Sequence, residues 1–274
     1  MDEKEIKAPE KIKISACLIL KNEQRTIARC LESIFNFCYE FIIGIDDQDS
    51  EDTQLEVIKF FQAKGFTSGT DEGSRKSFIL MDQGNAIKTA WIYSYTWEKS
   101  FSKARNQGMD MASGDYILIM DGHEYIPETW YNIGMSRFIN MMEAFPGIIR
   151  IIGKERPEEA HLNLYLQPFH GQTPNNFFLQ PRIYLNRPDI RFNRDAHNVI
   201  KGVDQEKVIH CPEIIILHDA PEDNRAVRKD QRLEMNIKAL RADIGRNPQD
   251  TRARFYLGNT LMEAQDWTKA IEQF

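Results

Sequence analysis

The sequence predicts an α/β protein followed by a small all-α extension, and three patterns carry this prediction. Apolar strand-like runs alternate with segments of helical periodicity through the first half of the chain. Short apolar runs separated by Pro, Asn and Gly follow from residue 148 to residue 217, as is typical of irregular β structure. From residue 222 onwards the apolar residues return to helical spacing. Alternation of strands and helices implies parallel strands joined by crossover helices.

The first strand is expected at 12–20, where the run IKISACLIL ends at Lys21-Asn22-Glu23. Asn22 is expected to cap the helix that follows, because Asn is favoured at helix N-termini. The apolar side chains of this helix recur at helical spacing: Ile27, Cys30, Leu31 and Ile34. A second strand is expected at 41–45, and another helix follows it.

A third strand is expected at 78–81, after a Gly-, Ser- and Asp-rich loop over 65–76. The Tyr- and Trp-rich residues 91–97 carry no clear periodicity. A helix over 101–112 then leads to a fourth strand at 116–120.

Polar, mostly acidic residues follow all four expected strands, beginning at Asn22, Asp46, Asp82 and Asp121. Asp and Asn are common in any turn, so one such junction means little. In open α/β sheets, however, ligands bind outside the carboxyl ends of the strands. Four polar junctions on one expected edge therefore favour a binding site there.

The final part of the chain is expected to be helical. One apolar stripe comprises Leu233, Ile237, Leu240 and Ile244. Asn247-Pro248 interrupts the stripe, and a new helix is expected from about Thr251. The chain is accordingly divided into an α/β domain at 1–220 and a helical extension at 221–274.

Composition narrows the class of protein. The 274 residues are 42% hydrophobic and 28% charged, which is ordinary for a globular chain. The formal charge of −6 argues against nucleic acid as a partner. No secretory leader or membrane-spanning run is visible, and the four cysteines form no disulfide or metal-site pattern. A cytoplasmic location is therefore expected.

Three stretches, at 14–34, 41–53 and 97–126, together resemble the family 2 glycosyltransferases. The first, ISACLILKNEQRTIARCLESI, is similar to that family's opening strand and helix. The second, FIIGIDDQDSEDT, is similar to its strand followed by an Asp and a Ser/Thr/Asp-rich turn. The third contains a Phe-Ser-x-x-Arg-Asn helix and an acidic strand end, DGHEYI. The resemblance covers roughly residues 12–220 and implies a GT-A fold, whose mixed sheet is flanked by helices.

The resemblance implies an enzyme that moves a hexosyl or related sugar from a nucleotide-diphosphate sugar to an acceptor. It implies donor contacts at Leu20, Asn22, Glu23, Asp46, Asp47, Arg105, Asn106, Asp121 and Gly122. Asp46 would contact the base or ribose, and Arg105 would pair with phosphate or hold an active-site carboxylate. The expected acceptor is a protein, peptide or glycan.

A departing diphosphate needs charge stabilisation, which a divalent metal can supply. The family's Asp-x-Asp motif is here Asp121-Gly122-His123, so an imidazole replaces the second carboxylate. Imidazole favours Mn²⁺ over Mg²⁺. Asp121, His123 and His197 are the metal ligands that the resemblance implies, and His218 is a further candidate. An inverting transfer also needs a general base, for which Glu124 and Asp195 are the carboxylate candidates.

The last 22 residues, ARFYLGNTLMEAQDWTKAIEQF, resemble the start of a tetratricopeptide repeat. Since such a repeat spans about 34 residues, the resemblance favours a truncated chain. The extension is expected to position the acceptor, with protein contact or self-association left open.

Two other hypotheses compete with the enzyme. One is a catalytically inactive module that binds nucleotide-sugars or, through the repeat-like helices, a protein. The other is a dinucleotide-binding Rossmann domain, which is disfavoured because no Gly-x-Gly-x-x-Gly follows the first strand.

Overall fold

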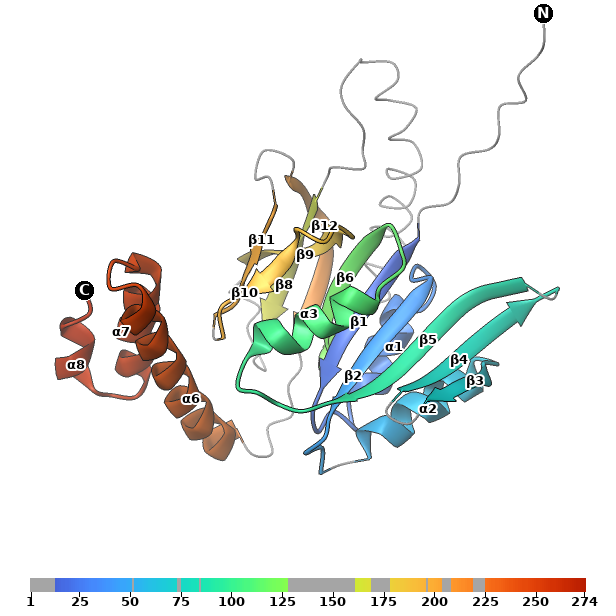
Figure 1. Ribbon diagram of the computed structural model, residues 1–274, viewed down its shortest axis with the longest axis horizontal. Coiled ribbons are helices and arrows are strands. Elements are labelled where there is room, and N and C mark those ends of the chain that lie inside the picture. Colours follow the sequence, from blue (N-terminus) through green and yellow to red (C-terminus); the bar gives the residue numbers. More distant parts are fainter. Residues whose placement is uncertain are drawn as a thin grey trace, which may run out of the picture.

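The computed structural model describes residues 13–50, 52–72, 75–83, 85–127, 161–168, 178–195, 197–203, 208–218 and 225–274. These residues form one long mixed sheet with the strand order β3-β4-β5-β2-β1-β6-β9-β8-β12-β7. A separate hairpin, β10-β11, lies beside the sheet, and a group of helices ends the chain (Figure 1). The predicted α/β class, with a mixed sheet flanked by helices and followed by a small helical part, is confirmed.

The centre of the sheet is parallel. It comprises β5 (Asn85–Tyr95), β2 (Glu40–Asp46), β1 (Ile14–Leu20) and β6 (Tyr116–Asp121). Nearly every residue of β1, β2 and β6 is buried, which explains why these strands are continuous apolar runs in the sequence. This core places their carboxyl ends at one edge.

Antiparallel strands complete both sides of the sheet. On one side β3 (Thr67–Glu72) pairs with β4 (Arg75–Asp82), and β4 pairs with β5. On the other side, β9 (Phe178–Leu185) pairs with β6, and β8 (His161–Pro168) pairs with β9. The long strand β12 (Val208–His218) joins β8 in parallel and holds the short β7 (Glu124–Tyr125) at its end. The hairpin consists of β10 (Arg191–Asn193) and β11 (Val199–Lys201).

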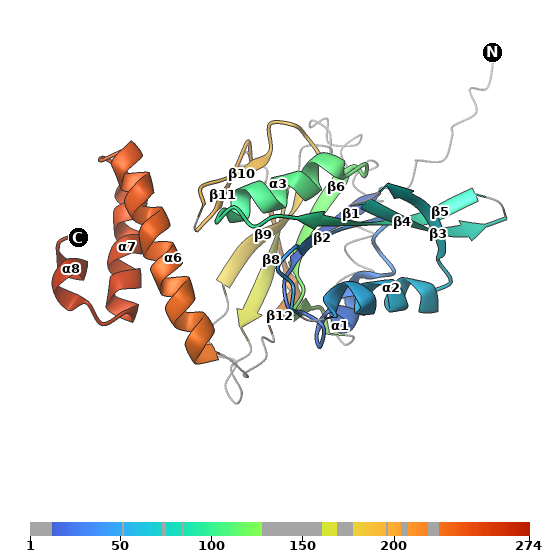
Figure 2. The same ribbon diagram turned by 60° about the horizontal axis from the view of Figure 1, so that its bottom comes forward.

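Helices cover both faces of the parallel centre. Figure 2 shows α1 (Ile27–Ile34) and α2 (Thr53–Ala63) on one face and α3 (Phe101–Met111) on the other. The four apolar positions predicted for α1 are all buried, as an amphipathic helix requires. The cysteines Cys17, Cys30 and Cys38 are free thiols in this core.

The C-terminal helices are α6 (Arg225–Arg246), α7 (Thr251–Glu263) and α8 (Trp267–Ile271). The break at Asn247-Pro248 and the helix start at Thr251 are confirmed, since Asp250 accepts a hydrogen bond from Ala253 N at 2.9 Å and caps α7. In the described part of the chain, no helix is long and apolar enough to cross a membrane.

Three sequence predictions about local structure are wrong. The segment 65–76, expected to be a loop, contains β3 and the start of β4. The strand expected at 78–81 is part of β4, which runs antiparallel to β5, so Asp82 lies at the opposite edge from Asp46. Asn22 does not cap α1, because its side-chain oxygen accepts hydrogen bonds from Ser50 instead. The strand-like run at 148–152 lies outside the described residues.

Candidate functional site

The rim at the carboxyl ends of β1 and β2 is cross-linked by polar side chains. Asp46 is 3% exposed, accepts the Gln48 amide at 2.9 Å and lies 3.3 Å from Lys21 Nζ. Asn22 has a left-handed backbone (φ 56°), and its amide donates to Asp49 Oδ1 at 3.1 Å. The ends of the two strands therefore form one rigid polar edge.

Asp121 ends β6 on this edge and forms an ion pair with α3. Arg105 Nη2 donates to Asp121 Oδ1 at 2.9 Å. Burial raises the pKa of Asp121, but the charges of Arg105, Arg182 and His123 outweigh burial and lower it to about 2. The carboxylate is therefore ionised throughout the neutral range.

His123 joins two distant segments. Its Nδ1 lies 2.9 Å from Glu23 Oε1, and its Nε2 lies 2.7 Å from Nε2 of His218 at the end of β12. Burial lowers the pKa of His123, but the Glu23 hydrogen bond and the charge of Asp121 outweigh it and raise the pKa to about 9. A protonated His123 carries a hydrogen on both ring nitrogens, so it can donate to Glu23 Oε1 through Nδ1.

Gly122, between Asp121 and His123, is required by close packing. A Cβ at this position would lie 2.7 Å from Leu20 Cδ2 and 2.9 Å from Glu23 Cγ. The motif turn thus packs directly on the end of β1 and the start of the following loop.

Glu124 is occupied on both carboxylate oxygens by Arg182. Arg182 Nη2 donates to Oε1 at 2.7 Å and Nη1 to Oε2 at 2.9 Å, and Oε2 also accepts the Asp121 amide. Burial raises the pKa of Glu124, and the Arg182 guanidinium opposes that shift. This geometry favours a positioning role for Glu124 over the general-base role considered from the sequence. Sequence reasoning missed Arg182, although an arginine inside the strand run FFLQPRIYL needs a buried partner.

Several residues expected at the donor site make other contacts. Asp47 accepts a hydrogen bond from Thr96 Oγ1 at 2.6 Å. The side-chain amide of Asn106 is engaged by the Phe192 backbone: Nδ2 donates to O at 2.9 Å and Oδ1 accepts from N at 2.8 Å. Asn106 therefore anchors the β10-β11 hairpin to α3.

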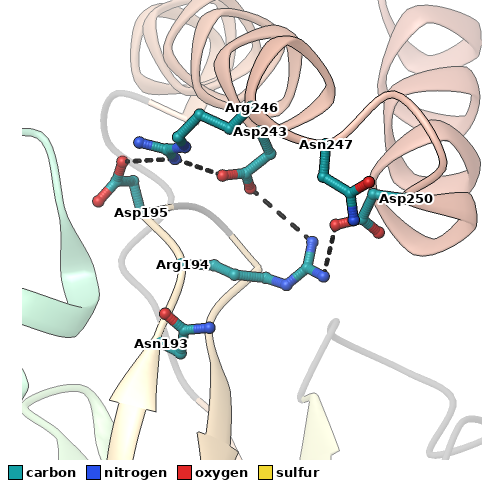
Figure 3. Close-up of a pocket in the computed structure, with 7 residues that line it drawn as sticks. All are labelled: Asn193, Arg194, Asp195, Asp243, Arg246, Asn247 and Asp250. Carbon is teal, nitrogen blue, oxygen red and sulfur yellow. Dashed lines mark hydrogen bonds and ion pairs between the residues drawn. The ribbon is translucent and has the colours of Figure 1, made fainter.

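His197 and Asp195 lie against the C-terminal helices. The His197 ring stacks on Tyr256 of α7 with 4.3 Å between ring centroids, and Asp195 pairs with Arg246 of α6 at 3.5 Å. Asp195 also lines a polar pocket of about 290 Å³ between the β10-β11 hairpin and the helices α6 and α7. Figure 3 shows its lining side chains: Asn193, Arg194, Asp195, Asp243, Arg246, Asn247 and Asp250. The structure thus brings His218, rather than His197, against His123.

The donor chemistry of the motif fits a transition metal, because it combines carboxylate and imidazole groups. Within the described ranges, no three His, Cys, Asp or Glu side chains converge closely enough to hold a metal ion. One Asp121 oxygen contacts Arg105, and the facing histidine nitrogens are hydrogen-bonded. Metal binding at Asp121, His123 and His218 would therefore require these contacts to rearrange.

Comparison with known proteins bears directly on this edge of the sheet. Residues 92–199 match the family model described as glycosyl transferase family 2. The match begins in β5, contains α3 and the whole Asp121-Gly122-His123 turn, and ends at β11. It supports the resemblance that the sequence motifs indicated.

Two curated relatives were found at 24% identity. One is a TPR repeat-containing protein of Synechococcus elongatus, matched over 93% of this chain and 55% of its own length. The other, matched over 72% of this chain and 60% of its own length, is from Methanococcus voltae. It is a dolichyl N-acetyl-α-D-glucosaminyl phosphate 3-β-D-2,3-diacetamido-2,3-dideoxy-β-D-glucuronosyltransferase. The chain thus spans 55% to 60% of the relatives that it matches.

Solved structures give more distant likenesses. A Pyrobaculum calidifontis mannosyltransferase in complex with GDP-Man and Mn²⁺ aligns over 97% of this chain and 75% of its own, at 11% identity and a TM-score of 0.49. The S. aureus TarS complex with UDP-GlcNAc aligns over 91% of this chain and 72% of its own, at 15% identity and a TM-score of 0.46.

Proposed function

We propose that this chain is a glycosyltransferase that takes its sugar from a nucleotide-diphosphate donor. The Asp121-Gly122-His123 turn carries this proposal, because it lies inside the family-matched segment and at the carboxyl edge of the parallel strands. That edge is where open α/β sheets bind nucleotides. The neighbouring Asp46 and Arg105 provide the acceptor and the cation that a nucleoside diphosphate needs.

Each rim residue has a distinct proposed role toward the donor. Asp46, fixed by Lys21 and the Gln48 amide, is suited to the ribose or base. Arg105 is suited to the diphosphate, since its buried Nε has no hydrogen-bond partner in the described structure while its Nη2 binds Asp121. A guanidinium placed there stabilises the charge that develops as the bond between the anomeric carbon and the diphosphate breaks.

Asp121, His123 and His218 are the proposed metal donors, with His218 in place of the His197 expected from the sequence. A bound Mn²⁺ or Mg²⁺ would supply Lewis-acid stabilisation of the leaving diphosphate. The proposed preference for Mn²⁺ rests on the two imidazoles.

The proposed transfer is inverting. The acceptor nucleophile attacks the anomeric carbon from the face opposite the diphosphate, which leaves with the bonding electron pair. Asp195, whose side chain is 35% exposed, is the remaining carboxylate candidate for taking the acceptor proton. The proposed acceptor is a protein, peptide or glycan. Because the name of the Methanococcus relative contains a dolichyl-linked sugar phosphate, lipid-linked sugars should also be assayed as acceptors.

A thermal-shift panel of UDP- and GDP-sugars, each with and without MnCl₂, tests this proposal. A donor at 100 times its Kd should stabilise the protein by about 2.7 kcal/mol. Asp121→Asn should abolish the metal-dependent part of that gain. The matched control is Asp115→Asn, because Asp115 precedes the opposite end of β6 and accepts the Lys13 amide at 2.8 Å. Absence of stabilisation by every donor, in both metal conditions, would refute the proposal.

The inactive binding module is the second candidate. It is favoured by the contacts of the motif, because the groups that would hold a metal are bonded to protein side chains: Asp121 is paired with Arg105, and His123 is hydrogen-bonded to His218. Donor hydrolysis or transfer, measured as released UDP or GDP, separates the two. Tight donor binding without any nucleotide release over hours would favour the module.

A further inference from the structure

Arg182 and Glu124 form an ion pair inside the sheet. Their side chains are 3% and 1% exposed, and their two hydrogen bonds form a fork between guanidinium and carboxylate. Charges are expensive to bury, so a pair this enclosed indicates a specific requirement. Arg182 Nη2 also contacts Gln180 Oε1 at 3.1 Å, which further fixes the guanidinium.

The same pair controls the backbone at the motif turn. Glu124 Oε2 accepts the Asp121 amide at 2.9 Å, and Arg182 Nη1 donates to the Ile119 carbonyl of β6 at 3.3 Å. The Glu124 backbone pairs with that of His218, whose ring meets His123. The ion pair therefore links the end of β6, the motif turn and the end of β12.

We propose that Arg182 is a positioning residue for donor binding, acting through Glu124 to hold the Asp121–His123 turn toward the diphosphate. This inference rests on the proposed function. It assigns Glu124 to the backbone of the turn, because its oxygens are committed to Arg182 and to the Asp121 amide.

A purely structural ion pair and a positioning pair predict different results when both charges are removed. Replacing a buried ion pair with apolar residues of similar volume is often neutral for stability. An apolar pair can refill the space, but it cannot accept the Asp121 amide. Stability and donor binding should therefore separate in such a variant.

The central experiment uses the double variant Arg182→Met/Glu124→Leu. Its matched control is Arg187→Met/Asp189→Leu, an Arg–Asp pair just after β9 whose side chains are about half exposed. The thermal midpoint of both variants should stay within a few degrees of wild type. Amide exchange of Asp121, followed by NMR, should become at least about tenfold faster in the double variant alone, because its acceptor is lost.

Binding of UDP and GDP, measured by calorimetry with and without MnCl₂, gives the second readout. The metal-dependent gain in nucleotide affinity should fall about 10- to 100-fold in the double variant, the range expected when a group that orients metal ligands is lost. Nucleotide affinity without metal should fall by a smaller factor than the metal-dependent gain. Arg182→Lys, which keeps the charge but loses the fork, should show a smaller loss in the same direction and guards against misfolding of the double variant.

Wild-type exchange and a wild-type metal-dependent gain in both Arg182 variants would overturn the inference. Failure of wild type to bind either nucleotide would instead count against the proposed function. Even then, amide exchange of Asp121 would still show whether the Arg182–Glu124 ion pair holds the Asp121–His123 turn in place.

Discussion

Arg194 fastens the β10-β11 hairpin to the C-terminal helices, and its removal should loosen that attachment. Its backbone is left-handed (φ 78°), and its guanidinium lies 2.6 Å from Asp250 and 3.9 Å from Asp243 (Figure 3). The Arg194, Asp250 and Asp243 side chains are 22%, 13% and 8% exposed, so the contact is largely shielded from solvent. Such shielding makes the pair stronger than an ordinary surface ion pair.

The magnitude follows from the contact that is lost. A hydrogen bond to a charged group contributes about 1.5–3 kcal/mol, and the 3.9 Å contact adds little. We expect Arg194→Ala to destabilise the protein by about 2 kcal/mol, which lowers the thermal midpoint by roughly 4–8 °C. Arg194→Gly should be about 1 kcal/mol less destabilising, because glycine adopts the left-handed backbone without strain.

Thermal unfolding and amide exchange across α7 (Thr251–Glu263) measure this effect. The control is Arg187→Ala, which breaks the exposed pair with Asp189 and should cost about 0–1 kcal/mol. If Arg194→Ala matched Arg187→Ala in midpoint and left exchange in α7 unchanged, the role assigned to Arg194 would be wrong.

Three further predictions concern the site. Because the folded-state pKa of His123 is raised to about 9, its stabilising charge should be fully present below the unfolded value of about 6.5 and lost as the pH rises through 9. The urea midpoint of unfolding should therefore differ less between pH 6 and pH 10 in His123→Gln than in wild type, and a pH dependence equal to that of wild type would contradict this. Gly122→Ala should cost about 1–3 kcal/mol by overpacking against Leu20, with donor binding weakened in the thermal-shift assay; wild-type values for both would contradict the packing argument. Asn106→Ala should cost about 1–3 kcal/mol by leaving the Phe192 backbone unpaired, with donor affinity retained; lost donor affinity in a variant of normal stability would restore Asn106 to the donor site.

The central sheet could be predicted because burial on both faces makes β1, β2 and β6 continuous apolar runs. The β3-β4 hairpin could not, because β3 has the sequence TSGTDE, whose composition resembles a loop. Its strand conformation comes from pairing with β4, a tertiary contact that local composition does not record.

The candidate site was predictable in part. Asp46, Asp121 and His123 follow apolar strands, so their common edge follows from topology alone. Which distant histidine meets His123 depends on β7 pairing with β12, and this places His218 there. Arg182 was missed for a related reason: its partner Glu124 is 58 residues away in the chain.

The charges of this cluster bear on how a metal would bind. Glu23, Asp121 and Glu124 supply three negative charges, while Arg105, Arg182 and a His123 protonated below pH 9 supply three positive charges. A balanced cluster offers a dication little net attraction, so the diphosphate must bring the negative charge.

We therefore expect MnCl₂ alone to bind weakly at neutral pH, and the metal and the nucleotide to bind together with positive coupling. Calorimetric titration of MnCl₂ with and without UDP measures this coupling. Arg105→Gln would remove one positive charge from the cluster and should strengthen metal binding in the absence of UDP. Tight binding of Mn²⁺ to the wild-type protein in the absence of UDP would show that the charges of this cluster do not make metal binding depend on the nucleotide.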